Sequence, residues 1–222
     1  MLIQRPGCNF VDWNQTLFHA MKKEHFDTLL DTSSFRFNSD GSFYDPLEKI
    51  SAASDLTEQV DTSAQLVNGE RVEELFFCHC WHKSEKLQGT MYHANDSTPK
   101  HVILKTDFRA LYDSIRSNEV FAGEVSYRNL YNFDPKSLPR FNLKFIKDDF
   151  WANEEEFRLV IVRRKGPENP EYLTVEVDLN TVLHEVIVRH TEREWYEVVR
   201  ESVEKISSDI RVSLSVGTSL DS

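Results

Sequence analysis

The sequence predicts an α+β fold, a single domain with mixed, mostly antiparallel small sheets and peripheral helices. Short apolar stretches with the two-residue period of strands outnumber stretches with a helical period. Tight turns mix with helical crossovers between these stretches, which is typical of α+β proteins. We expect residues 1–16 to be an irregular lead-in, 17–216 to be the domain and 217–222 to be a tail.

The individual elements follow from local periodicity and turn residues. Strands are predicted at 17–21, 35–38, 75–81, 101–106, 120–127, 156–163, 172–177, 185–188 and 210–216. Helices are predicted at 22–30, after an Asp107 cap, and after a Thr191-x-x-Glu194 capping box. Residues 128–150 are predicted to be loop plus a short helix, and 172–177 to pair as a hairpin with 156–163.

Composition excludes several classes of function. The chain has 7 glycines in 222 residues, and none forms G-x-G. The dinucleotide-binding fingerprint, the Walker phosphate loop and the G-x-S-x-G nucleophile elbow are therefore absent. The net charge of −11 disfavours extended nucleic-acid binding and is compatible with a protein partner. An odd count of 3 cysteines, and no apolar run suited to a signal peptide or a membrane span, favour the cytoplasm.

A cysteine and histidine segment, Cys78-His79-Cys80-Trp81-His82, has two interpretations. With His93 and His101 it contains enough ligands for a zinc site. However, C-x-C in an apolar strand is more often a pair of small core residues, so we favour buried, reduced thiols without a metal.

An acidic segment at the start of the predicted strand 156–163 is the leading candidate for chemistry. On a strand, Glu154, Glu156 and Arg158 project from one face. Two neighbouring carboxylates repel, so one could have the raised pKa that a general base or charge stabiliser needs. The alternative is a solvated acidic strand end that Arg158 neutralises, and the residues alone favour this alternative.

The order of several motifs resembles the bacterial family called domain of unknown function 2971. The matching elements are, in chain order, Leu17–Ala20, Phe43-Tyr44-Asp45-Pro46-Leu47-Glu48, Phe77–Cys80, Met91-Tyr92, His101–Asp107, and Lys147, Trp151, Glu154, Glu156 and Arg158 in a K-x-x-x-W-x-x-E-x-E-x-R pattern. Tyr44 and Tyr92 depart from the Asn and Trp of the family pattern. From the residues alone, Asp45 before a proline is more readily a turn residue than a catalytic one.

The family's layout is similar to that of ADP-ribosyltransferases, and this resemblance implies NAD as a co-substrate. It assigns Glu156 and Glu154 as catalytic residues that stabilise an oxocarbenium-like ribose, and His19, Tyr44 and Arg158 as NAD-binding residues, with no metal. The alternative is a non-catalytic binding domain of a phage-defence or toxin–antitoxin system. A metal-dependent nuclease is a third hypothesis, which the acidic net charge disfavours.

Overall fold

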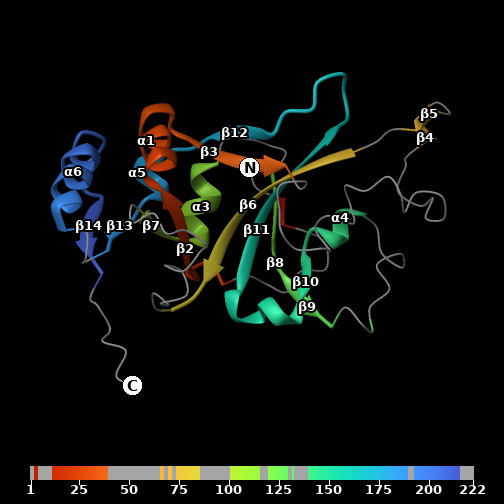
Figure 1. Ribbon diagram of the computed structural model, residues 1–222, viewed down its shortest axis with the longest axis horizontal. Helices are drawn as coiled ribbons and strands as arrows, with labels where there is room; N and C mark the ends of the chain where they lie inside the picture. The colour runs from red at the N-terminus through yellow and green to blue at the C-terminus, as the bar shows by residue number, and fades with distance from the viewer. Residues whose placement is uncertain are drawn as a thin grey trace. The chain divides into compact units, whose positions relative to one another are not determined.

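The computed structural model describes residues 3–4, 12–39, 66–67, 70–71, 74–85, 101–115, 120–129, 132, 140–189 and 193–215 (Figure 1). These residues belong to two compact units that interleave along the chain. Unit 1 comprises Met1–Phe10, Arg36–Cys80 and Ser117–Thr174, and unit 2 comprises Val11–Phe35, Trp81–Arg116 and Val175–Ser222. The extent of the predicted domain, 17–216, stays a prediction.

Unit 1 is built around strand β11, which is hydrogen-bonded on both sides. Its elements are β1 (Ile3–Gln4), β4 (Leu66–Val67), β5 (Glu70–Arg71), β8 (Val120–Glu124), β9 (Ser126–Arg128), α4 (Arg140–Leu143), β10 (Ile146–Asp148), the 3-10 helix η6 (Asp149–Glu154) and β11 (Glu156–Arg164). β11 runs antiparallel to β8 and has β6 (Glu74–Lys83) as its other neighbour. β1 pairs with β8 in parallel, and β9 and β10 form a separate parallel ribbon.

The core of unit 1 follows from the apolar runs in these strands. Phe76, Cys78, Phe145 and Val160 form one buried cluster. Residues 156–161 of β11 are all buried, so this part of the strand has no solvated face. A strand covered on both faces has no alternating pattern, which explains the continuous apolar run at 159–162.

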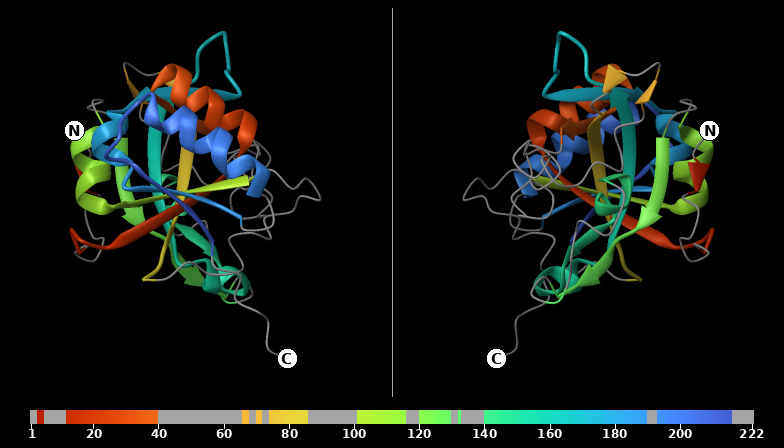
Figure 2. Two further views of the ribbon diagram at one scale, coloured as in Figure 1. Left: turned by 90° about the vertical axis from the view of Figure 1, so that its left-hand side faces the viewer. Right: turned by 90° about the vertical axis from the view of Figure 1, so that its right-hand side faces the viewer.

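Unit 2 is a layer of strands with helices beside it. Its elements are β2 (Thr16–Lys22), α1 (Lys23–Thr32), β7 (His101–Asp107), α3 (Phe108–Ser114), α5 (Leu179–Val182), β13 (Glu185–Val188), α6 (Arg193–Glu204) and β14 (Arg211–Leu214). β7 pairs antiparallel with both β2 and β13, and β14 pairs in parallel with β13. α1 and α6 lie side by side (Figure 2), with Lys23 Nζ 5.4 Å from the centre of the Trp195 ring.

The fold class predicted from the sequence is confirmed: the protein is α+β, with mostly antiparallel pairing and few helices. One predicted pairing is wrong. β12 (Tyr172–Glu176) pairs with β3 (Ser34–Ser39) and not with β11. The reason is that β8 and β6 already occupy both edges of β11, so the hairpin partner must find another edge.

Two further corrections concern unit 1. The strand predicted at 120–127 is divided into β8, which pairs with β11, and β9, which pairs with β10. The region 128–150 contains strand β10 as well as the predicted short helix. Thr191 of the predicted capping box and residues 43–48 lie outside the described residues. Within the described part of the chain, no helix combines the length and apolar character that crossing a membrane requires.

Candidate active site

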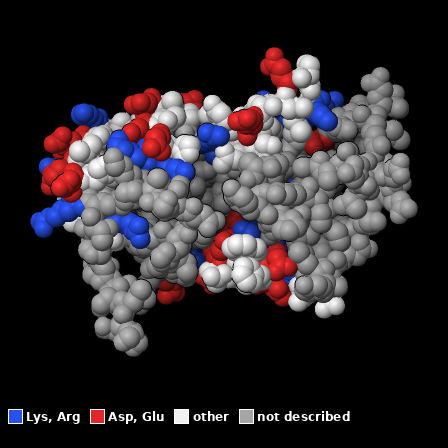
Figure 3. All heavy atoms as spheres, in the orientation of Figure 1, with Lys and Arg blue, Asp and Glu red and all other residues white. Residues whose placement is uncertain are grey.

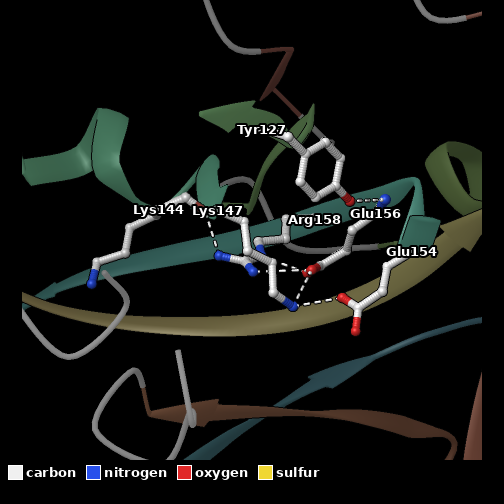
Figure 4. A network of polar contacts seen from close by, with 6 residues as sticks. All are labelled: Tyr127, Lys144, Lys147, Glu154, Glu156 and Arg158. Atoms are coloured by element: carbon white, nitrogen blue, oxygen red, sulfur yellow. Dashed lines mark hydrogen bonds and ion pairs between the residues drawn. The ribbon is translucent and has the colours of Figure 1, made fainter. Parts of the chain in front are cut away.

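The candidate site is formed in unit 1, where β10, η6 and β11 follow one another. The Asp148 side chain caps the first turn of η6. Glu155 adopts a left-handed backbone, with φ of 43°, and ends this short helix. The helix returns the chain to the start of β11, so Lys147, Glu154 and Glu156 come together (Figure 4).

The centre of the site is a buried ion pair between Glu156 and Arg158. Glu156 is 4% exposed and Arg158 is 1% exposed. Arg158 Nε lies 2.5 Å from Glu156 Oε1, and Nη2 lies 3.0 Å from Oε2. The third guanidinium nitrogen, Nη1, donates to the carbonyl oxygen of Lys144 at 2.8 Å. The bidentate contact of Nε and Nη2 with the two carboxylate oxygens fixes the Glu156 carboxylate in one orientation.

Lys147 connects the two carboxylates that the sequence singled out. Its Nζ lies 2.6 Å from Glu154 Oε2 and 3.3 Å from Glu156 Oε2. The side chain of Glu154 is 27% exposed, whereas that of Glu156 is 3% exposed. Glu154 is therefore the carboxylate of this network that a ligand in solvent can reach.

The electrostatics of Glu156 reverse one expectation from the sequence. Burial by itself raises the pKa of this carboxyl, but Arg158, Lys147 and a hydrogen bond with Cys80 outweigh burial and lower the pKa to about 2. The prediction of a raised carboxylate pKa is wrong for Glu156. The prediction that Arg158 neutralises it is confirmed, although the site is buried instead of solvated.

Tyr127, on β9, holds the backbone of Glu156. The Glu156 N–H donates to Tyr127 Oη at 2.7 Å. Burial, followed by the negative charges of Glu156 and Glu154, raises the pKa of Tyr127 to about 12, although the hydrogen bond from Glu156 and the charge of Lys147 act in the opposite direction. The hydroxyl therefore stays neutral at physiological pH and serves as a fixed acceptor for the first residue of β11.

The structure brings together three of the five predicted site residues: Glu154, Glu156 and Arg158. His19 lies on β2 in unit 2, half-buried, with its ring centre 5.3 Å from that of Trp81. Tyr44 lies outside the described residues. The roles of His19 and Tyr44 in NAD binding stay predictions.

The cysteine and histidine segment lies on β6. Cys78 is buried in the apolar core cluster of unit 1, as predicted. Cys80 is half-buried, so the prediction that it is buried is wrong, and its side chain hydrogen-bonds to the Glu156 carboxylate. His79 Nδ1 lies 3.0 Å from the carbonyl oxygen of Arg36. Among the described residues, no group of three or more metal-ligating side chains could hold a metal ion.

Sequence reasoning missed the roles of Tyr127, Lys144 and Cys80 in this site. Lys147 was named only as part of the motif with Glu154 and Glu156, and its charge, opposite to theirs, is the signal for the ion pairs that it forms. The other three contact the ion pair only through tertiary packing: Tyr127 from β9, Cys80 from β6, and Lys144 through a backbone oxygen. No local pattern marks them.

Comparison with known proteins gives structural matches alone. No protein-family model matches the chain, so membership of the domain of unknown function 2971 family is not shown. No curated protein matches it either. The chain is similar to three structures of Thermus sp. 2.9 DarT, in complex with ADP-ribosylated ssDNA, NAD+ and carba-NAD+.

The DarT matches are extensive in length but distant. The ADP-ribosylated ssDNA complex is 11% identical with a TM-score of 0.37, and the match covers 94% of this chain and 97% of that chain. The NAD+ complex is 10% identical with a TM-score of 0.37, covering 93% and 98% respectively. The carba-NAD+ complex is 10% identical with a TM-score of 0.36, covering 92% and 97%.

Proposed function

We propose that the protein is an ADP-ribosyltransferase-like enzyme that cleaves NAD at the carboxylates preceding β11. The observation that carries this proposal is the convergence of Glu154 and Glu156 on one ammonium group, Lys147 Nζ, at 2.6 and 3.3 Å. A rigid pair of carboxylates, one inside and one accessible, suits a reaction in which positive charge develops on a sugar.

In this proposal Glu154 is the catalytic residue. Its carboxylate stabilises the positive charge that develops on the ribose when the bond to nicotinamide breaks. The effect is largest when the carboxylate is fixed before the reaction, because no energy is then spent on reorganising it. The contact with Lys147 and the position at the end of η6 supply that rigidity.

Glu156 and Arg158 are positioning residues in this proposal. The Glu156 side chain is only 3% exposed. It therefore acts on a ligand through Lys147 and not by direct contact. Arg158 bonds Glu156 and the Lys144 carbonyl oxygen with its guanidinium. Arg158 was predicted to bind NAD directly; we propose instead that it positions Glu156. We assign direct catalysis to Glu154.

The test is nicotinamide release from NAD, measured by chromatography for the wild type, Glu154→Gln and Glu168→Gln. The second variant makes the same chemical change at an exposed residue in the loop after β11. We expect Glu154→Gln to lower kcat by about 10²- to 10³-fold, as expected for loss of one preorganised electrostatic group. KM should change little, because the contact acts mainly in the transition state. Glu168→Gln should behave as the wild type.

Two results would contradict the proposal. A Glu154→Gln rate equal to that of the wild type would remove Glu154 from the catalytic role. No nicotinamide release by the folded wild type, with water, peptide and oligonucleotide acceptors, would exclude NAD cleavage.

A second candidate function is a non-catalytic binding domain, and one observation favours it. The Glu156 carboxylate is fully engaged by Arg158, Lys147 and Cys80. A buried network of this kind also occurs where ions have a purely structural role. Unchanged unfolding of the protein on addition of NAD, together with absent cleavage, would support this second function.

A further inference from the structure

The helix η6 presents an unusual amount of aromatic surface. Phe150 is 76% exposed, the highest value among the large apolar side chains of the described residues. Its ring meets that of Trp151 edge-on, with the centres 5.0 Å apart. Lys147 Nζ lies over the Trp151 ring, 5.3 Å from its centre. Adjoining aromatic rings that reach the surface are enriched at binding surfaces.

Carboxylates flank this aromatic pair. Residues 148–155 contain Asp148, Asp149, Glu154 and Glu155, and no lysine or arginine. Figure 3 shows acidic side chains, with some basic atoms among them, around uncharged ones along the lower middle of the described surface. Arg128 lies opposite Asp148 in the β9–β10 ribbon, so Asp149 and Glu155, both exposed, are the carboxylates that we assign to partner binding.

We propose that η6 is a docking surface for a basic segment of another polypeptide, one that carries apolar side chains between its arginines or lysines. We call Asp149, Phe150, Trp151 and Glu155 the η6 surface. Apolar side chains of the partner pack on Phe150 and Trp151, and its cations pair with Asp149 and Glu155. The flat guanidinium of arginine suits both partners, since it stacks on aromatic rings and pairs with carboxylates.

Charge decides between a basic polypeptide and a nucleic acid. Exposed aromatic rings also stack on bases, but nucleic-acid sites surround such rings with lysine and arginine to neutralise phosphates. The η6 surface has the opposite sign, and the whole chain carries −11. A polyanion is therefore repelled where a cationic peptide is attracted.

The test is fluorescence anisotropy without NAD, so its outcome is independent of whether the protein cleaves NAD. The probes are a short labelled peptide of alternating arginine and leucine, the same peptide with glutamate for arginine, and an oligothymidylate. We expect the arginine peptide to bind, with affinity that falls as salt rises. Phe150→Ala should weaken this binding by about tenfold, as for loss of a central aromatic contact.

Charge variants distinguish a specific role of Asp149 and Glu155 from the effect of the protein's overall negative charge. Asp149→Asn with Glu155→Gln should weaken binding of the arginine peptide and reduce its dependence on salt. The matched control, Glu168→Gln with Glu171→Gln, removes the same charge from exposed residues elsewhere in unit 1 and should leave binding unchanged. Tyr172→Ala, which removes an aromatic ring that is 44% exposed on β12, is the control for Phe150→Ala.

The proposal is overturned if the arginine peptide binds no better than the glutamate peptide, or if the oligothymidylate binds more tightly than either. Equal binding by Phe150→Ala and the wild type, with both shown to be folded by thermal unfolding, also overturns it. So does an equal loss in the two charge variants, because the carboxylates of η6 would then have no specific role.

Discussion

Glu156 and Arg158 illustrate how two charges can be buried without unfolding the protein. Each would be costly alone, but the guanidinium and carboxylate satisfy one another through two contacts, at 2.5 and 3.0 Å. The residues are two positions apart on β11, so their side chains project from the same face. The pairing therefore follows from the local geometry of the strand, whereas the contacts with Lys147 and Cys80 come from other elements.

This arrangement predicts that Glu156→Gln destabilises the fold. The substitution leaves the Arg158 charge buried beside a neutral amide, and the free energy of unfolding should fall by about 3–5 kcal/mol. Urea unfolding monitored by circular dichroism measures this change. Neutralising an exposed acidic residue, by contrast, should change the free energy of unfolding by less than about 0.5 kcal/mol.

The double variant Glu156→Gln with Arg158→Met is the matched control. The double variant removes both charges. It should therefore lower the free energy of unfolding by clearly less than the sum of the losses measured for Glu156→Gln and Arg158→Met alone. If the two single losses simply add in the double variant, Glu156 and Arg158 do not stabilise one another, and the account of the pair fails.

At the scale of elements, helix α3 begins at an N-cap residue that acts locally. Asp107 takes an extended backbone, and its Oδ1 accepts a hydrogen bond from the Ala110 N–H at 2.8 Å. This is the cap that the sequence predicts. Cap contacts depend on residues three apart in the chain, so they form in the same way whatever packs around the helix.

We expect Asp107→Ala to lower the free energy of unfolding by about 1 kcal/mol, because one N–H of the first helical turn loses its acceptor. His184 Nδ1 lies 3.7 Å from Asp107 Oδ2, so all the variants are compared at one fixed pH. Asp113→Ala, an exposed change within the same helix, is the control. Equal stability of the two variants would show that the cap contributes nothing.

For the whole molecule, the lowered pKa of Glu156 makes stability depend on pH. The pKa is about 2 in the folded protein, against an ordinary value of 4.5. A carboxyl with a lowered folded pKa stabilises the fold above its unfolded pKa and loses that contribution as pH falls through its folded pKa. Glu156 should therefore contribute about 3 kcal/mol at neutral pH, lost between about pH 5 and pH 2.

Urea unfolding at pH 7, 5, 4 and 3 tests this expectation. The wild type should lose stability more steeply than the Glu156→Gln, Arg158→Met double variant, since the latter lacks the group. Other carboxylates contribute the same slope to both proteins, so they cancel in the comparison. Parallel curves over this range would mean that the pKa of Glu156 is not lowered.

The sequence by itself determined many of the strands and helices, although not β10 or η6, and the charged pattern at the start of β11. Strand and helix periods, the Asp107 cap and the spacing of Glu154, Glu156 and Arg158 are all local, because residues a few positions apart decide them. The same spacing could not say whether these charges are solvated or buried, and the solvated alternative was wrong for Glu156.

Only the tertiary structure decided which strands meet and what surrounds the charges. β12 pairs with β3 because both edges of β11 are occupied by β8 and β6, a competition between segments far apart in the chain. β6 also brings Cys80 to Glu156, and β9, which follows β8 in the chain, brings Tyr127. Burial by these neighbours makes charge pairing obligatory, and pairing in turn lowers the pKa of Glu156 and leaves Glu154 as the accessible carboxylate. Such contacts depend on the choice of strand edge, which no local pattern encodes.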